Sequence, residues 1–192
     1  GVPIITGDTK VVERGKADGV FINTTGIGVV PEGVNISGER ARPGDKILIN
    51  GFIGDHGMAV MAQRENLKFE TPVLSDSAAL HELVAAMVAE VPDIHCLRDP
   101  TRGGVAATLN ELARQSRVGM TIREKALPIR EEVSATCEFL GFDPLYVANE
   151  GKLIAICPAE AAERLLAAMR RHPLGEHSAI IEAGQARELG IA

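Results

Sequence analysis

The amino-acid sequence predicts a domain of the α/β or α+β class, in which a mixed sheet is covered by helices on one side. Short apolar runs of strand composition alternate with windows in which apolar residues recur every three or four positions, the spacing of an amphipathic helix. Glycine and proline separate these runs, and we find no internal repeat. With 192 residues, 45% of them hydrophobic, the chain can bury a core of this kind.

Two strand-like runs, residues 20–25 (VFINTT) and 46–50 (KILIN), lie near the start of the chain. The segment between them, residues 31–45, carries three glycines and two prolines among polar residues, a composition typical of a connection. We therefore predict a domain boundary in this segment, with residues 1–34 ending one domain and residues 35–192 forming the next.

The rest of the chain is expected to alternate helices and strands. Residues 77–91 show the helical spacing, with Asp76 or Ser77 as the cap and Pro92 as the stop. Two further runs, 145–148 and 153–157, are expected to be strands of a hairpin. The other predicted strands are at 94–97, 119–123 and 178–181, and the other predicted helices run from Gly104 to about Gln115, from Arg130 to Leu140 and from Pro158 onward.

The charge of the chain limits its partners. A net charge of -6 and a pI near 5.4 oppose general affinity for nucleic-acid phosphates or anionic membranes, because no basic excess can replace their counterions. No run approaches the roughly 18 apolar residues of a membrane span, and residues 1–10 lack the pattern of a signal peptide. We therefore expect a cytoplasmic protein that binds small molecules or other proteins.

The cysteines and histidines do not indicate a metal site. Cys96, Cys137 and Cys157 are odd in number and far apart, which fits neither a disulfide framework nor a CxxC pair. We expect buried, reduced thiols. The five histidines show no spacing that would place two imidazoles on one helix face.

Two short polar motifs place charged groups beside glycine. Residues 7–10 (GDTK) can hold Mg²⁺ and phosphate oxygens, although a turn with a surface ion pair is the default interpretation of these residues alone. Residues 149–151 (NEG) form a polar turn between apolar runs. A plain hairpin turn with left-handed residues is the simple interpretation, and only neighbours in space would make Glu150 a base.

Two glycine-containing turns each follow a predicted strand and open a predicted helix. Residues 51–57 (GFIGDHG) would present backbone amides and a helix N-terminus to an anion, although Asp55 can also simply cap the helix that His56 begins. Residues 98–104 (RDPTRGG) repeat the arrangement with two arginines suited to forked contacts with phosphate or carboxylate. The alternative for this second turn is an ordinary N-cap with glycines for tight packing.

Four segments, taken in order, resemble the HypE family of hydrogenase maturation factors: GDTKVVERGKADGVFINTTGIG, RPGDKILINGFIGDHGMAVM, LRDPTRGGVA and VANEGKL. The resemblance covers about residues 1–157, and the DPTRGG and GDHG forms favour HypE over its relatives, aminoimidazole ribonucleotide (AIR) synthetase and selenophosphate synthetase. It implies the last strands of a PurM-like amino-terminal domain, which forms the dimer and the ATP site, followed by an AIR synthase-like carboxyl-terminal domain.

The resemblance also implies the activity of an ATP-dependent carbamoyl dehydratase. In that family ATP, with Mg²⁺, phosphorylates the oxygen of a carboxamide carried on a terminal cysteine, and loss of phosphate leaves a thiocyanate that supplies cyanide to the [NiFe] centre. The implied partners are ATP, the carbamoyltransferase HypF, the HypC–HypD complex and a second copy of the full-length protein. Two alternatives remain: a noncatalytic interaction module of the maturation complex, and a related ATP-using synthetase such as one like selenophosphate synthetase.

The motifs assign roles to individual residues by this resemblance. Asp8 would hold the metal or the nucleotide phosphates, and Lys10 would neutralise charge. Glu150 would transfer or orient a proton, and His56 completes the candidate catalytic group. The residues assigned to the cofactor and substrate cleft are Asp8, Asp55, Asp99, Thr101, Arg102, Gly103 and Gly104.

Two departures from the family pattern predict a truncated form that is inactive alone. The amino-terminal portion of the ATP site is absent upstream of Gly1, and residues 186–192 stand where a tail ending in proline, arginine, isoleucine and cysteine is expected. Apolar residues such as Val20, Ile22 and Ile27 would then be exposed, which predicts self-association. The main structural expectation is that the GDTK, NEG and two glycine-turn motifs converge on one anion-holding cleft.

Overall fold

The computed structural model describes residues 2–65 and 73–181, and the chain divides into two compact units, residues 1–31 and 32–192. The second unit contains every helix and strand of the described chain. None of these helices has both the length and the apolar character needed to cross a membrane. The assignment of the two parts to successive domains of a larger protein stays a prediction.

The described residues of the first unit form turns and extended backbone without a helix or strand. The strand predicted over residues 20–25 is therefore wrong, and Val20, Phe21 and Ile22 are 82%, 77% and 85% exposed. A strand needs a neighbour that satisfies its backbone hydrogen bonds, and residues 2–31 supply none. The exposure of these apolar side chains keeps the predicted self-association open to experiment.

A four-stranded sheet forms the centre of the second unit. All pairings among its described strands are antiparallel, where the sequence predicted a mixed sheet, because such short runs carry no signal of strand direction. The predicted α+β class is confirmed. The strands are β1 (Lys46–Ile49), β2 (Cys96–Arg98), β3 (Ile154–Cys157) and β4 (Ala179–Ile180), in the order β2-β3-β1-β4.

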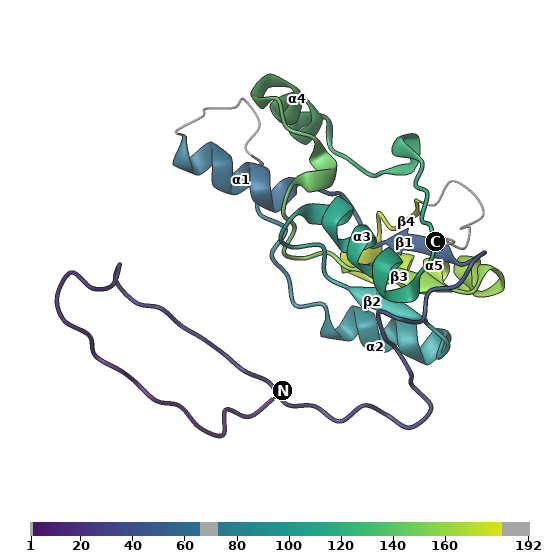
Figure 1. The fold of residues 1–192 in the computed structure, drawn as a ribbon, viewed down its shortest axis with the longest axis horizontal. Coiled ribbons are helices and arrows are strands. Elements are labelled where there is room, and N and C mark those ends of the chain that lie inside the picture. Colours follow the sequence, from purple (N-terminus) through teal and green to yellow (C-terminus); the bar gives the residue numbers. More distant parts are fainter. Residues whose placement is uncertain (1, 66–72, 182–192) are drawn as a thin grey trace. The chain divides into compact units, whose positions relative to one another are not determined.

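Helices cover both faces of this sheet (Figure 1). Successive strand residues point to opposite faces, so Ile47 joins the cluster under α3 (Gly104–Ser116), whereas Leu48 joins the cluster under α2 (His81–Glu90) and α5 (Ala162–Arg170). The expectation of helices on one side was wrong. All four residues of β3 are buried, and a strand buried on both faces needs cover on both.

Two further helices, α1 (Asp55–Arg64) and α4 (Glu131–Leu140), build a smaller cluster of their own. Met58 of α1 packs there with Val133 of α4. As predicted, α4 ends at Gly141, whose φ of 73° is in the left-handed region that glycine adopts without strain. The packing of the two helices sets the start of α1 close to the start of α4.

The helix expected over residues 77–91 begins later, at His81. Neither Asp76 nor Ser77 caps it, since no side chain forms an N-cap hydrogen bond there. The carboxylate of Asp76 instead contacts the turn at residues 150–152. This difference changes Asp76 from a local helix signal into part of a long-range contact.

Two of the predicted strands are absent from the described structure. Residues 145–148 form no strand, because Pro144 opens a 3-10 turn, η2 (Pro144–Tyr146), that Asp143 caps. Residues 119–123 form only an isolated bridge at Ile122. The remaining 3-10 turns are η1 (Glu124–Ala126), η3 (Ala159–Ala161) and η4 (Pro173–Gly175).

The three cysteines are buried free thiols, as predicted. Burial raises the pKa of Cys157 to about 12 and also raises the pKa of Cys96 and Cys137. His95 is a core histidine whose Nδ1 lies 2.7 Å from Asp45 Oδ2. Across the described ranges, no group of three or more His, Cys, Asp or Glu side chains is arranged to hold a metal ion.

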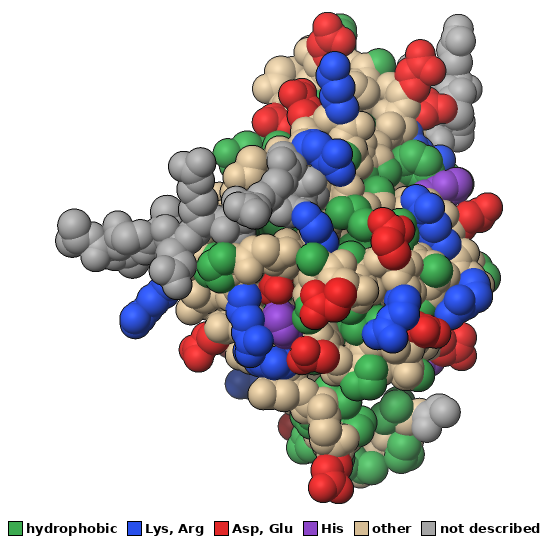
Figure 2. Space-filling model, turned by 90° about the vertical axis from the view of Figure 1, so that its right-hand side faces the viewer, with side chains coloured by type: hydrophobic (Ala, Val, Ile, Leu, Met, Phe, Trp, Pro, Cys, Tyr) green, Lys and Arg blue, Asp and Glu red, His purple; other side chains and the backbone are tan. Residues whose placement is uncertain are grey.

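Charged side chains of both signs are interspersed on the surface shown in Figure 2. Blue Lys and Arg side chains alternate there with red Asp and Glu side chains instead of gathering in one block. A continuous basic track of the kind that follows a nucleic-acid backbone is not seen on this face.

Candidate functional site

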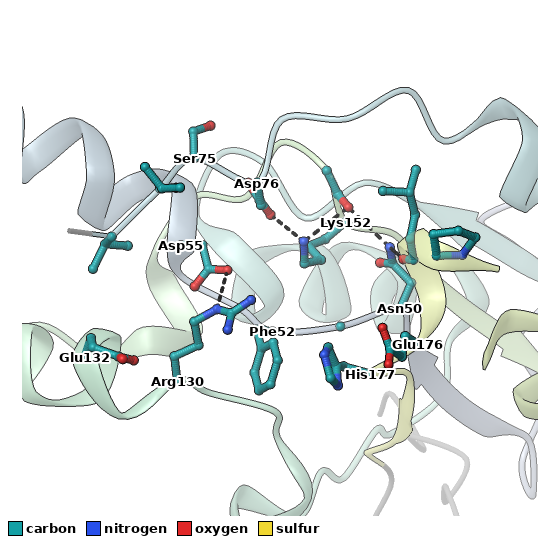
Figure 3. Close-up of a pocket in the computed structure, with 16 residues that line it drawn as sticks. Asn50, Phe52, Asp55, Ser75, Asp76, Arg130, Glu132, Lys152, Glu176 and His177 are labelled. Atoms are coloured by element: carbon teal, nitrogen blue, oxygen red, sulfur yellow. Dashed lines mark hydrogen bonds and ion pairs between the residues drawn. The ribbon is translucent and has the colours of Figure 1, made fainter. Parts of the chain in front are cut away.

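A cavity of ≈ 460 Å³ opens beside the turn that follows β1, next to the starts of α1 and α4 (Figure 3). Four carboxylates line it against two side chains that carry a fixed positive charge, so its lining is negative overall. An anion would therefore meet net repulsion inside it. The charged lining residues are Asp55, Asp76, Glu132, Glu176, Arg130 and Lys152.

Asp55 is a buried carboxylate at the first residue of α1, and its side chain is 7% exposed. Its Oδ2 accepts a hydrogen bond from Arg130 Nε at 3.1 Å, whereas its Oδ1 has no hydrogen-bond partner among the residues described. Burial raises the pKa of Asp55, and the Arg130 guanidinium opposes that rise only in part. The capping role that the sequence allowed for Asp55 is not realised, because Gly54 precedes the helix and no side chain caps it.

A buried ion pair between Asp76 and Lys152 holds the turn that carries Glu150. Lys152 Nζ lies 2.9 Å from Asp76 Oδ2, out of line for a hydrogen bond, and the two side chains are 12% and 3% exposed. Asp76 Oδ1 accepts a hydrogen bond from Glu150 N at 3.1 Å. Gly151 also packs against Asp76 so closely that any Cβ would collide with the Asp76 carbonyl oxygen. The backbone of Glu150 is thus fixed while its side chain stays exposed.

Phe52 and His177 form an aromatic wall of the cavity, with ring centroids 4.6 Å apart and ring planes tilted by 47°. The guanidinium carbon of Arg130 lies 4.2 Å from the Phe52 ring centroid. Figure 3 shows Arg130 between Phe52 and Asp55, held by the ring on one side and the carboxylate on the other. These two contacts fix Arg130 even though its side chain is 48% exposed.

The buried side chain of Asn149 joins three of the four sequence motifs. Its Oδ1 accepts a hydrogen bond from Gly54 N at 2.8 Å. Its Nδ2 donates to Pro100 O and to Val147 O, both at 3.0 Å. The turns at residues 51–57 and 98–104 therefore meet the NEG motif at one amide, whereas the expected common anion-holding cleft stays a prediction.

The turns at residues 51–57 and 98–104 contact residues 145–148 from two sides. These contacts help to explain why residues 145–148 form no strand. Gly57 N donates to Ala148 O at 3.0 Å. Gly104 has a φ of 63°, and a Cβ there would lie 2.7 Å from Val147 O. The backbone that a hairpin partner would have used is committed to these contacts. The left-handed residues expected at Asn149 and Gly151 are also absent, since neither has a positive φ.

Three predicted site residues lie at or beside the cavity. Asp55 lines it, and Glu150 immediately precedes the lining residues Gly151 and Lys152. His56 does not line it but is half-buried next to it, with Nδ1 2.9 Å from the Oγ of the lining residue Ser75.

The predicted residues of the 98–104 turn lie outside this cavity. Asp99 and Arg102 are exposed and Thr101 is half-buried. Asp99 and Thr101 do not cap α3, which follows Gly103 without a side-chain cap, so the capping alternative is wrong. Gly103 has a φ of 74°, in the left-handed region, so the backbone conformation explains why a glycine stands at this position.

Asp8 and Lys10 lie in the first unit, where their side chains are exposed. Asp8 Oδ1 accepts a hydrogen bond from Thr9 N at 2.8 Å, a local turn contact. Their roles toward a nucleotide stay predictions.

Sequence reasoning missed most of the cavity. It took Asp76 for a helix cap, and it did not single out Arg130, Lys152 or His177. The sequence could have indicated Lys152 as a site residue, because it directly follows the NEG motif and a charged residue beside a turn with a proposed function is a candidate for the same site. No local pattern shows that His177, 25 positions beyond Lys152, returns to the same cavity.

Residues 42–188 match the sequence profile of the AIR synthase related protein, C-terminal domain. The chain belongs to the AIR synthase related protein family. This family assignment covers most of the second unit and confirms the predicted AIR synthase-like fold.

Within this family, the chain is similar to carbamoyl dehydratase HypE, as its motifs predicted. It is 70% identical to the carbamoyl dehydratase HypE of Azotobacter vinelandii over 181 residues, which are 94% of this chain and 53% of that protein. The structure of a HypE–HypF complex matches with a TM-score of 0.79 at 46% identity, over 82% of this chain and 51% of that chain. HypE in complex with ATP matches with a TM-score of 0.76 at 55% identity, over 80% and 45%. The chain thus spans about half the length of the relatives it matches.

Proposed function

We propose that this chain forms the carboxyl-terminal part of a HypE-like carbamoyl dehydratase that serves hydrogenase maturation. In the proposed reaction a carboxamide carried on a cysteine loses its oxygen as phosphate and loses both N–H protons, so that a thiocyanate is left. The junction of three motif turns at Asn149, in a chain 70% identical to a carbamoyl dehydratase, is the observation that supports this most strongly.

ATP would supply the phosphoryl group that turns the amide oxygen into a leaving group. The protein must then hold the phosphoryl oxygens with cations and N–H donors, and it must accept protons from the amide nitrogen. We assign the cation to Lys10 and the nucleotide and substrate contacts to the glycine turns. The residues assigned there are Asp55, Asp99, Thr101, Arg102, Gly103 and Gly104.

Glu150 is our candidate for the group that accepts or orients the amide proton. A general base needs an accessible carboxylate in a fixed position. The side chain of Glu150 is exposed, and its backbone is held by the hydrogen bond to Asp76 and by the close packing of Gly151. His56, half-buried beside the cavity, is the second candidate for proton transfer.

Magnesium would enter this site together with the nucleotide. Mg²⁺ is commonly bound by one or two carboxylates plus phosphate oxygens, so a dedicated cluster of protein ligands is unnecessary. The described chain brings no three metal-ligating side chains together, which fits a site built mainly on phosphates. Asp8, the exposed carboxylate of the GDTK motif, would then be one ligand.

ATP and HypF, two of the proposed partners, are supported by the relatives. One HypE structure contains ATP and another contains HypF. For this chain we infer ATP, HypF as the source of the carboxamide and the HypC–HypD complex as the acceptor of cyanide. We also infer a homodimer of the full-length protein, in the cytoplasm.

A chimera tests the proposed function. The segment of the A. vinelandii HypE that matches this chain is replaced by the corresponding 181 residues, and the rest of that relative is kept. With ATP and a carbamoylated cysteine, the chimera is expected to produce the thiocyanate, seen by mass spectrometry as the loss of one water. The unaltered relative is the positive control. A chimera that binds ATP as tightly as the relative but leaves the substrate mass unchanged would favour a noncatalytic module and contradict the proposal.

A further inference from the structure

The cavity contains a carboxylate oxygen that the described protein leaves unsatisfied. Asp55 Oδ1 has no hydrogen-bond partner there, although the Asp55 side chain is only 7% exposed. A buried acceptor without a donor costs free energy, so a ligand that donates a hydrogen bond to this oxygen would be stabilised there. The cavity, at ≈ 460 Å³, has the size of a small-molecule site.

The charge of the lining determines the class of ligand. Four carboxylates against Arg130 and Lys152 disfavour a phosphate or a nucleotide. A metal ion without phosphate oxygens is disfavoured as well, because it would need more protein ligands than the described side chains bring together. A neutral group that both donates and accepts hydrogen bonds fits this lining best.

Lys152 provides the donor that such a group needs. Its ammonium has three N–H bonds. It donates a hydrogen bond to Gly151 O at 3.3 Å and forms an ion pair with Asp76 Oδ2 at 2.9 Å, and the described structure contains no further hydrogen bond from it. Lys152 also acts on Asp55 across the cavity, since burial raises the pKa of Asp55 and the Lys152 charge is among those that oppose the rise.

We propose that this cavity binds the carboxamide of the substrate, with Asp55 Oδ1 accepting a hydrogen bond from its NH2 group and Lys152 Nζ donating to its carbonyl oxygen. The inference rests on the proposed function, which supplies the carboxamide. Gly151 and Lys152 line the cavity and directly follow Glu150, so a carboxamide bound there lies next to the turn that carries the proposed base. Phe52 and His177 would pack against the arm that carries the carboxamide.

The test uses the 192-residue chain and a small probe, N-acetyl-S-carbamoylcysteine amide. Binding is followed by protein-observed NMR titration without ATP. The chain is expected to bind the probe, and Asp55→Asn is expected to weaken binding about tenfold or more, because the carboxylate acceptor is replaced by a weaker, neutral amide oxygen. Glu163→Gln, an equal change of charge at an exposed position of α5, is expected to leave binding unchanged. An S-dimethylcarbamoyl probe, which lacks the N–H donors, is expected not to bind.

Three results would overturn the inference: no binding of the first probe, equal binding by the Asp55→Asn chain, or equal binding of the dimethyl probe. Thermal unfolding of each variant shows whether it is folded when it is titrated. The chimera assay separates this inference from the proposed function. An active chimera that keeps its full kcat/KM after Asp55→Asn contradicts the binding site alone. An inactive chimera, combined with probe binding that depends on Asp55, contradicts the reaction and supports the site.

Discussion

Asn149 Oδ1 accepts a hydrogen bond from Gly54 N at 2.8 Å, and this contact ties the NEG motif to the turn that begins α1. Gly54 is followed by Asp55, and Asn149 is followed by Glu150. The contact between the two motifs therefore couples the position of a buried carboxylate to that of an exposed one. Because Asn149 also donates to Pro100 O, the third motif turn is held at the same point.

Replacing Asn149 by alanine is expected to destabilise the fold by about 2–4 kcal/mol, because it removes three hydrogen bonds and leaves buried backbone groups unpaired. Urea unfolding measures the change. Asn110→Ala is the matched control, since Asn110 is exposed on α3 and its side chain bonds only to Ala106 O of its own helix. Equal losses in the two variants would mean that the Asn149 junction does not hold the turns together.

Gly104→Ala is expected to cost about 2–4 kcal/mol, since it combines a positive φ of 63° with a Cβ placed 2.7 Å from Val147 O. Gly141→Ala separates the two causes. Gly141 has a φ of 73° but open space around its Cβ position, so only the backbone strain of about 1 kcal/mol should appear there. Denaturant unfolding of both variants checks the difference, and similar values for the two would rule out a steric role for the close approach.

Lys152→Met is expected to cost about 3–5 kcal/mol, because it leaves the carboxylate of Asp76 buried without its counter-charge. The double variant with Asp76→Asn should recover part of that loss, since the uncompensated charge is then gone. A double-mutant cycle in urea measures this coupling. Additive losses, with no recovery in the double variant, would show that the pair contributes nothing as a pair.

The contribution of Asp55 to the free energy of unfolding is expected to change with pH in the direction opposite to that of a salt-bridged carboxylate with a lowered pKa. Burial raises its pKa in the folded state, so its contribution is fully present below the unfolded pKa and is lost as the pH rises through the folded pKa. As the pH rises, Asp55 therefore contributes less to the stability of the fold, and Asp55→Asn, which carries no titrating carboxyl group, should gain in Tm relative to the unaltered chain. Melting curves from acidic to neutral pH should show the advantage of the variant growing with pH. A difference in Tm that stays constant with pH would contradict a raised pKa.

The sequence predicted most of the helices and the buried strands, because periodicity and glycine or proline stops are local signals. α3 and α4 begin and end close to the predicted positions, and Gly141 stops α4 as expected. Several of the failures depend on distant parts of the chain. Residues 145–148 have strand composition, but Gly57 and Gly104 occupy the backbone that a strand would pair.

The candidate site was predictable only where it coincides with a motif. Asp55 and Glu150 stand in recognisable glycine-containing turns, so their chemistry could be suspected from neighbouring residues. Asp76 looked like a helix cap because the sequence does not show that residue 150 lies beside it. Arg130 likewise has no local signal, since its role depends on the tertiary approach of Phe52 and Asp55.

The most direct measurement is single-turnover phosphate release by the chimera loaded with ATP and a carbamoylated cysteine, compared with its Glu150→Gln variant. We expect the chimera to release one phosphate for each thiocyanate that it forms. We expect the Glu150→Gln variant to bind ATP but to form neither product. Thiocyanate formation at the same rate in the Glu150→Gln variant would contradict the proposed role of the NEG turn. A chimera that binds ATP and its substrate but forms neither product would contradict the proposed function itself.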